Sequence, residues 1–276
     1  MGKLTAMALA AGAAAVLTLP AAQAADMPPV MYKPVPVVED FAGGWYLRGD
    51  IGMSNQRVGK LHNVLFDTPG VAVTQHSNEF SSAPFFGLGI GYQYNGWLRF
   101  DLTGEYRGKS TFRGMDTYTP EPNSPTGIGV NDYHAKKSEW VVMANAYFDL
   151  GTWGGFTPFV GGGIGGSYNI ISGFRDVNVP VGGVAYAGSA GTWNFAWAVH
   201  AGIGYQVSPS FTVELAYRYL NLGDARTGDI IAYDGTNTIY NPMHFRNIDS
   251  HDLKLGVRWL INAPVPVYAP PVMTKG

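Results

Sequence analysis

Polar and apolar residues alternate strictly over Trp97–Arg107, which reads WLRFDLTGEYR. Successive side chains of a strand point to opposite faces, so this pattern predicts a β-strand. One face is apolar, and the other carries Arg99, Asp101, Thr103, Glu105 and Arg107. In a soluble sheet the charged face would meet water. In a membrane barrel it lines the lumen, and the apolar face meets lipid.

Seven further segments show the same alternation, which brings the number of predicted strands to eight. They are Trp45–Met53, Ala83–Tyr94, Glu139–Leu150, Thr157–Tyr168, Trp193–Val207, Phe211–Leu220 and His251–Ile261.

The connections between these segments alternate between long and short. Asn95-Gly96, Gly151–Phe156 and Ser208–Ser210 are short and rich in turn-forming residues. The four long connections are Ser54–Ser82, Gly108–Ser138, Asn169–Thr192 and Asn221–Ser250. This layout predicts an all-β fold. We expect an eight-stranded antiparallel up-and-down transmembrane β-barrel with four long extracellular loops and short periplasmic turns.

The faces that we assign to the lumen hold six positive and six negative side chains. They are Arg48, Asp50, Arg99, Asp101, Glu105, Arg107, Asp149, Glu214, Arg218, Asp252, Lys254 and Arg258. We expect these charges to pair, because an unpaired buried charge costs several kcal/mol. Eight strands enclose an interior about wide enough for side chains alone, so a wide pore is not expected. A narrow water-filled path remains open as an alternative.

The outward faces are aliphatic and aromatic. Nine aromatic residues lie towards segment ends, where an interfacial girdle is expected: Trp45, Trp97, Tyr106, Trp140, Phe148, Trp193, Tyr205, Tyr217 and Trp259. The inward positions of the second and fifth segments are rich in glycine, which relieves crowding opposite Arg, Tyr and Glu side chains.

The N-terminal residues 1–24 resemble a secretory signal peptide, with Lys3, an apolar region and an A-x-A site at Ala22–Ala24. The apolar region is short and Ala-rich for a transmembrane anchor. We expect the mature chain to consist of a Pro-rich periplasmic arm (25–43), the barrel (44–261) and a Pro-rich periplasmic tail (262–276). Pro-Val-Pro-Val occurs in both the arm and the tail, which are either disordered or contact a periplasmic partner.

Composition argues against several functions. The chain has 18 Lys and Arg against 20 Asp and Glu, which does not indicate nucleic acid binding. It contains no cysteine, and therefore no disulfide or thiolate metal site. Only 14% of its residues are charged, which is low for a soluble domain.

Three motifs resemble catalytic or binding sites. Gly161–Gly166 matches a phosphate loop but is followed by strand-like residues and not by a helix. In Ser250-His251-Asp252 the last two residues point to opposite faces of a strand, so they cannot form a relay. Four histidines fall in predicted outer loops without metal-ligand spacing: His62, His76, His134 and His244. His200 faces the lumen. We therefore expect no enzyme, and no catalytic, cofactor-binding or metal-binding residues.

Several stretches resemble those of small alphaproteobacterial outer-membrane proteins. They are GGWYLRGDIG, VVMANAYFDLG with TPFVGGGIG, and YRYLNLG before a last strand LKLGVRW. The resemblance covers about residues 41–261 and is to the broad OmpA-like and Opa-like eight-stranded barrel group, often called a porin family. It implies a Gram-negative outer-membrane protein. Such proteins usually end on an aromatic residue of the last strand, whereas here Asn262–Gly276 follow, without a peptidoglycan-binding domain.

The combined pattern predicts a structural role in envelope integrity, with loops exposed at the cell surface. Adhesin-like binding through the long loops and a narrow pore for ions or small solutes are the alternatives. The expected partners are outer-membrane lipid, lipopolysaccharide, the barrel assembly machinery and a periplasmic contact through the Pro-rich tails.

Overall fold

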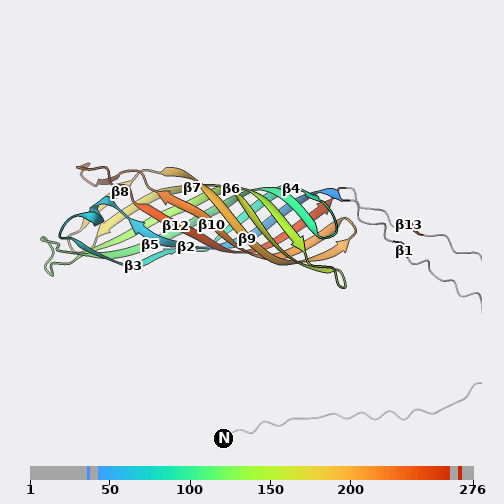
Figure 1. Ribbon diagram of the computed structural model, residues 1–276. Helices are drawn as coiled ribbons and strands as arrows, with labels where there is room; N and C mark the ends of the chain where they lie inside the picture. The colour runs from blue at the N-terminus through green and yellow to red at the C-terminus, as the bar shows by residue number, and fades with distance from the viewer. Residues whose placement is uncertain (1–35, 38–42, 262–266, 269–276) are drawn as a thin grey trace, which may run out of the picture. The chain divides into compact units, whose positions relative to one another are not determined.

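Eight long strands close into an antiparallel barrel (Figure 1). The computed structural model describes residues 36–37, 43–261 and 267–268. The barrel strands are β2 (Gly44–His62), β4 (Ala83–Gln93), β5 (Leu98–Thr119), β6 (Gly129–Asp149), β7 (Phe156–Asn178), β9 (Ala190–Ser208), β10 (Phe211–Arg226) and β12 (His244–Leu260). Each pairs with the next along the chain, and β12 pairs with β2. The predicted fold class is confirmed.

Shorter elements extend this sheet. The strands β3 (Ala72–Phe80), β8 (Gly183–Ala187) and β11 (Ile230–Ala232) join it, and a 3₁₀ turn η1 covers Val64–Asp67. Within the described residues, no helix is long and apolar enough to cross a membrane.

The two Pro-Val repeats also contain strand residues. β1 (Pro36–Val37) and β13 (Val267–Tyr268) form a separate two-stranded sheet. The rest of both arms and residues 1–24 lie outside the described residues, so their predicted roles stay predictions.

The strands continue into segments that we predicted as loops. β5, β6 and β7 contain 22, 21 and 23 residues, whereas a membrane-spanning strand needs about 9–11. About half of each strand therefore lies beyond the membrane. Alternation marks only the part of a strand whose outward side chains are apolar, and in the extensions many outward side chains are polar, such as Lys109, Thr111 and Arg113 of β5.

A β-bulge on β5 marks this boundary. The register of β5 against β6 shifts between Arg107 and Ser110. Before the bulge, odd-numbered residues such as Arg107 face the interior; after it, even-numbered residues such as Phe112 do. The polarity of the outward face changes at the same point. Before the bulge this face is apolar, and beyond it the exposed residues include Lys109 and Arg113.

Between the short turns and the bulge, the outer surface of the barrel is an apolar band. One exposed aliphatic residue per strand illustrates it: Ile51, Leu88, Leu102, Val142, Ile164, Val199, Leu215 and Leu255, all at least 48% exposed. Near the bulge, a row of aromatic residues crosses five neighbouring strands in direct register: Phe86, Tyr106, Trp140, Tyr168 and Trp193. These are features of a lipid-facing surface with an aromatic girdle.

The interior beyond the bulge is apolar, as in a soluble barrel. Its largest cluster contains Phe80, Phe112 and Phe245, whose ring centroids lie 4.8–6.1 Å apart. Phe112 and Phe245 are completely buried. One barrel therefore contains two inverted halves, with a charged interior inside the lipid band and an apolar interior beyond it.

The end of the barrel away from this apolar cluster has short turns. Asn95 Oδ1 accepts hydrogen bonds from the Trp97 and Leu98 amides, at 3.0 and 2.7 Å. Ser208 Oγ accepts one from the Phe211 amide, at 3.1 Å. Leu260 pairs with Tyr46, so the barrel begins and ends here.

The lipid-facing assignment predicts different effects for two arginine substitutions on β5. Leu102→Arg places a charge in the apolar band and should lower the free energy of unfolding by about 2–4 kcal/mol. Thr111→Arg, also outward but beyond the bulge, should change it by less than about 0.5 kcal/mol. Urea titration in lipid vesicles measures both. Equal effects would contradict the assigned boundary.

Candidate functional site

The interior of the lipid-embedded half is filled by charged side chains, which we call the lumen ion network. Eleven of the twelve predicted charges are buried, and the Arg258 side chain is 11% exposed. The β-strand alternation places all twelve on the inward faces of β2, β5, β6, β10 and β12. The structure therefore brings the predicted residues together.

The part of the network nearest the short turns is centred on Arg48 and Glu214. The Arg48 guanidinium lies 2.9 Å from Asp50, 2.6 Å from Asp101 and 3.4 Å from Glu214. Glu214 also approaches Arg99 (3.1 Å) and Arg258 (3.5 Å). The Arg99–Glu214 contact is an ion pair without hydrogen-bond geometry, because Arg99 Nη1 and Glu214 Oε1 have no hydrogen-bond partner among the described residues. Arg99 also pairs with Asp149, at 3.1 Å.

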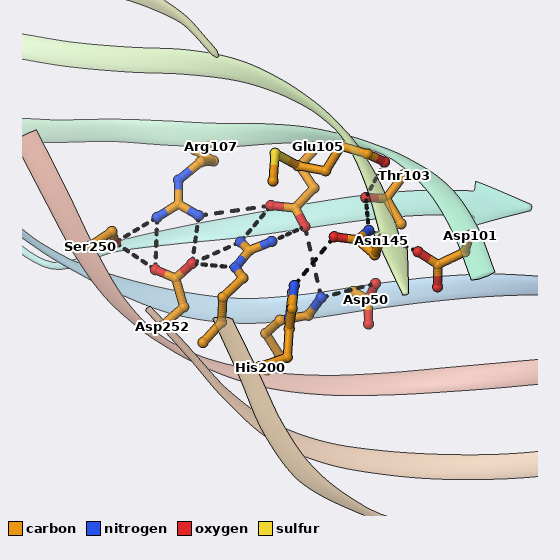
Figure 2. A network of polar contacts seen from close by, with 12 residues as sticks. Asp50, Asp101, Thr103, Glu105, Arg107, Asn145, His200, Ser250 and Asp252 are labelled. Atoms are coloured by element: carbon orange, nitrogen blue, oxygen red, sulfur yellow. Dashed lines mark hydrogen bonds and ion pairs between the residues drawn. The ribbon is translucent and has the colours of Figure 1, made fainter. Parts of the chain in front are cut away.

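The part nearest the bulge is built on bidentate arginine contacts, some of which Figure 2 shows. Arg218 donates to both oxygens of Glu105, at 2.6 Å each, and to Asp252 at 2.7 Å. Arg107 donates to both oxygens of Asp252, at 2.8 Å each, and to Glu139 at 2.8 Å. Such charge-assisted, bidentate bonds are among the strongest hydrogen bonds in proteins.

Lys254 joins the two parts. Its ammonium lies 3.4 Å from Asp50 and 3.8 Å from Glu105, and so contacts one carboxylate from each part. The network is therefore continuous from the short-turn end of the barrel to the bulge.

Two members of the network were missing from the sequence prediction. Lys137 and Glu139 are completely buried, and Lys137 Nζ lies 2.6 Å from Glu139. With them the network has seven cations and seven anions, so its formal charge remains balanced. The alternation that places Asp149 inward extends back to both residues. Lys137 was missed because Gly108–Ser138 was predicted to be a loop, whereas Glu139 is the first residue of the predicted segment Glu139–Leu150 and was left out of the inward set.

Glycines on β4 and β7 provide the space for these large side chains, as predicted. A Cβ on Gly87 would lie 2.7 Å from Cγ of Glu105, and one on Gly161 would lie 2.5 Å from the Tyr147 ring. Tyr147 in turn packs under Arg99, whose guanidinium carbon lies 4.4 Å from the ring centroid. Side chains at these glycines would displace the ion network.

The remaining candidate motifs do not form catalytic sites. Asp252 is buried in the network, whereas His251 accepts or donates a 2.6 Å hydrogen bond with Tyr217 on the outer face. Gly161–Gly166 lies within β7. In the residues that the structure describes, no group of three or more His, Asp or Glu could hold a metal ion.

The histidines differ in part from the prediction. The four predicted loop histidines lie on extended strands: His62 on β2, His76 on β3, His134 on β6 and His244 on β12. His200 faces the lumen, where it lies 3.3 Å from Asn145 Oδ1 (Figure 2).

Comparison with known proteins agrees with this architecture. The model of the outer membrane protein beta-barrel domain matches residues 11–259. The chain belongs to this family. Membership of the outer membrane protein beta-barrel domain family indicates the Gram-negative outer membrane as its location.

The relatives of this outer-membrane barrel come from alphaproteobacteria. An uncharacterised protein of Brucella suis is 32% identical over 236 residues, which cover 79% of this chain and 81% of the relative. A Rickettsia prowazekii protein named "Putative adhesin" is 28% identical over 83% of this chain and 93% of the relative. Among solved structures, outer membrane protein OprG from Pseudomonas aeruginosa is 14% identical, with a TM-score of 0.45 over 79% of this chain and 97% of that one.

Arg107→Leu tests the energetic role of the network. The substitution leaves Asp252 and Glu139 without one of their cations and should lower the free energy of unfolding by about 3–5 kcal/mol. Arg113→Leu removes an exposed arginine from the same strand and should change it by less than about 0.5 kcal/mol. Urea titration in vesicles compares the two variants, and equal stabilities would show that the buried pairs are not needed.

Proposed function

We propose that this outer-membrane barrel has a structural role in the envelope and does not conduct ions or solutes. The observation that supports this is the filled interior. Arg99, Arg107 and Lys137 in the ion network, and Phe112 and Phe245 beyond it, have 0% exposed surface. Water therefore reaches none of these side chains. The charged layer and the apolar layer lie one after the other along the barrel, and both fill its interior.

Two further expectations belong to this proposal. The first is export through cleavage of residues 1–24, followed by insertion by the barrel assembly machinery. Because Asn262–Gly276 follow the last barrel strand, the machinery would recognise an internal strand. The second is that residues 25–43 and 262–276 lie in the periplasm, where they contact a partner. Neither role requires an enzymatic activity, and we propose none.

Conductance across a planar lipid bilayer distinguishes a closed barrel from a pore. The purified full-length protein, once inserted, should give no sustained single-channel steps in 1 M KCl. A general porin added to the same bilayer serves as the positive control. Sustained steps whose number rises with the amount of inserted protein would contradict the proposal and favour the narrow-pore alternative.

A second candidate function is adhesion at the cell surface. It is favoured by the length of the strands beyond the lipid band and by the Rickettsia relatives named "Putative adhesin". The hairpin of β5 and β6 has its tip at residues 120–128, held by hydrogen bonds from the Asn123 amide to Glu121 and from the Gly127 amide to Ser124.

Replacement of this tip by a short Gly-Ser turn tests adhesion. If the protein is an adhesin, cells that display the variant should bind host cells several-fold less than cells that display the parent at equal surface density. The same replacement at the short turn Asn95-Gly96 is the control and should leave binding unchanged. Parental binding by the tip variant would exclude this tip as the adhesive surface.

A further inference from the structure

A cavity of about 530 Å³ lies beyond the apolar cluster, at the end of the barrel opposite the short turns. Met243 and Ile230 belong to both the cluster and the cavity wall. Small-molecule sites typically have volumes of about 300–1,000 Å³. The cavity is therefore large enough for a small organic ligand.

The cavity has an apolar side and a polar side. Much of the wall is apolar and includes Leu65, Phe66, Val73, Val184, Ile239 and Met243. The far ends of β5, β6 and β7 contribute the polar side chains Asp116, Tyr133, Asp176 and Asn178, and further polar residues come from the segments around η1 and after β11. A ligand that fits this wall has an apolar body and a localised polar group.

Some of the polar groups are already satisfied within the protein. Asp116 accepts hydrogen bonds from Tyr133 Oη at 2.7 Å and from Asn131 Nδ2 at 3.1 Å. The Asn178 side-chain amide donates to Tyr118 Oη at 2.6 Å. These bonds fix the orientation of the polar wall without a ligand.

Two oxygen acceptors on this wall have no donor. Asp176 Oδ1 and Asn178 Oδ1 are buried, and no described residue donates a hydrogen bond to either. The two residues are two positions apart on β7, so their side chains lie on the same face of the strand. A buried acceptor without a donor costs about 1–3 kcal/mol. Both acceptors would be satisfied by a ligand that donates hydrogen bonds.

The electrostatic surroundings of Asp176 favour a positively charged donor. Burial, and to a smaller extent the negative charges of Asp116 and Asp132, raise the pKa of Asp176 to about 7. The residue that pairs with Asp176 on β6 is Tyr133, and the one on β8 is Ala185. Neither neighbouring strand supplies a cation there.

We propose that this cavity binds a small organic cation, an ammonium group attached to an apolar body. The ammonium donates to Asp176 Oδ1 and Asn178 Oδ1, and the body packs on the apolar wall. An ammonium has three N–H donors and no acceptor. It therefore matches the two free acceptors, one of which is a carboxylate oxygen of Asp176 and the other the amide oxygen of Asn178. A divalent metal fits less well, because among the described residues no group of three or more His, Asp or Glu could hold a metal ion.

Three indole compounds of similar shape and different charge test the proposal. They are tryptamine (cation), tryptophol (neutral) and indole-3-acetate (anion), titrated calorimetrically into the full-length protein in detergent micelles at pH 8, with empty micelles subtracted. Tryptamine should bind at least about tenfold more tightly than the other two. Equal affinities for tryptamine and tryptophol, or tighter binding of indole-3-acetate, would overturn the proposal.

Variants locate the site. Asp176→Asn should lower the affinity for tryptamine to that for tryptophol. Asp249→Asn is the matched control, since Asp249 pairs with His251 at 3.5 Å, does not line the cavity and does not act on the pKa of Asp176. Ala185→Phe should abolish binding of both compounds, because its ring fills the cavity; it keeps the test valid if Asp176→Asn does not fold. Parental affinities in Asp176→Asn or Ala185→Phe, or displacement of tryptamine by calcium chloride in the millimolar range, would overturn the proposal.

The proposal also has a pH dependence with a defined sign. Protonation of Asp176 removes the charge that attracts the ammonium, so tryptamine should bind more weakly as the pH falls from 8 to 6. The ligand stays charged in this range, because primary amines titrate near pH 10. The affinity in Asp176→Asn should not change, and a parental affinity independent of pH would contradict the role of Asp176.

Other titratable groups lie around the cavity, and the Asp176→Asn variant separates their response to pH from that of Asp176. The groups on the elements around Asp176 are Asp116 and Tyr118 of β5, Glu121 of the tip after β5, His76 of β3, Asp132, Tyr133 and His134 of β6, Asp67 of η1, and Asp229 and Asp234 of the segment after β10. Asp67 pairs with His62 at 3.0 Å, and Asp234 and Asp229 accept hydrogen bonds from Thr236 and Asn241 in their own segment.

Discussion

The requirement that buried charges be paired governs the interior of this barrel. Lipid on the outside leaves the lumen as the only place for polar side chains within the membrane, and eight strands leave little space for water there. The seven cations and seven anions therefore contact one another, and Lys254 joins the two parts of the lumen ion network. Removing one partner costs more than the pair contributes, because the remaining charge stays buried.

The same constraint explains why the barrel inverts. Beyond the β5 bulge the outside of the wall meets water, so polar residues such as Lys109 and Arg113 can face outward and apolar ones such as Phe112 can fill the interior. The aromatic row that contains Tyr106 and Trp140 lies next to the bulge. The switch from odd-numbered to even-numbered residues facing inward and the change from lipid to water on the outside thus occur at the same level of the barrel. A group of polar side chains also lines the interior at the mouth, around Asp116 and Asp176.

Much of the fold could be predicted from the sequence, because a two-residue period and charge placement are local signals. Strands such as Trp97–Arg107 alternate strictly, so the inward position of Arg99 and Glu105 followed directly. The strand extensions could not be predicted in this way. Their outward residues are as polar as those of loops, and bulges at Gly108 and near Gly173 interrupt the period. Lys137 was missed for this reason. The mouth cavity depends on β5–β8 and on residues 230–243, which only the tertiary structure brings together.

The central claim is that the lumen ion network closes the barrel, and thiol accessibility tests it most directly. The chain has no cysteine, so a single introduced thiol gives an unambiguous signal. Thr103 faces the middle of the network and is 2% exposed, whereas Asn237 lines the mouth cavity and is exposed. In the folded protein, Thr103→Cys should not react with a small, membrane-impermeant methanethiosulfonate cation, and Asn237→Cys should react rapidly. Both should react after unfolding. Reaction of Thr103→Cys at a rate similar to that of Asn237→Cys in the folded protein would show a continuous water path and contradict the closed lumen.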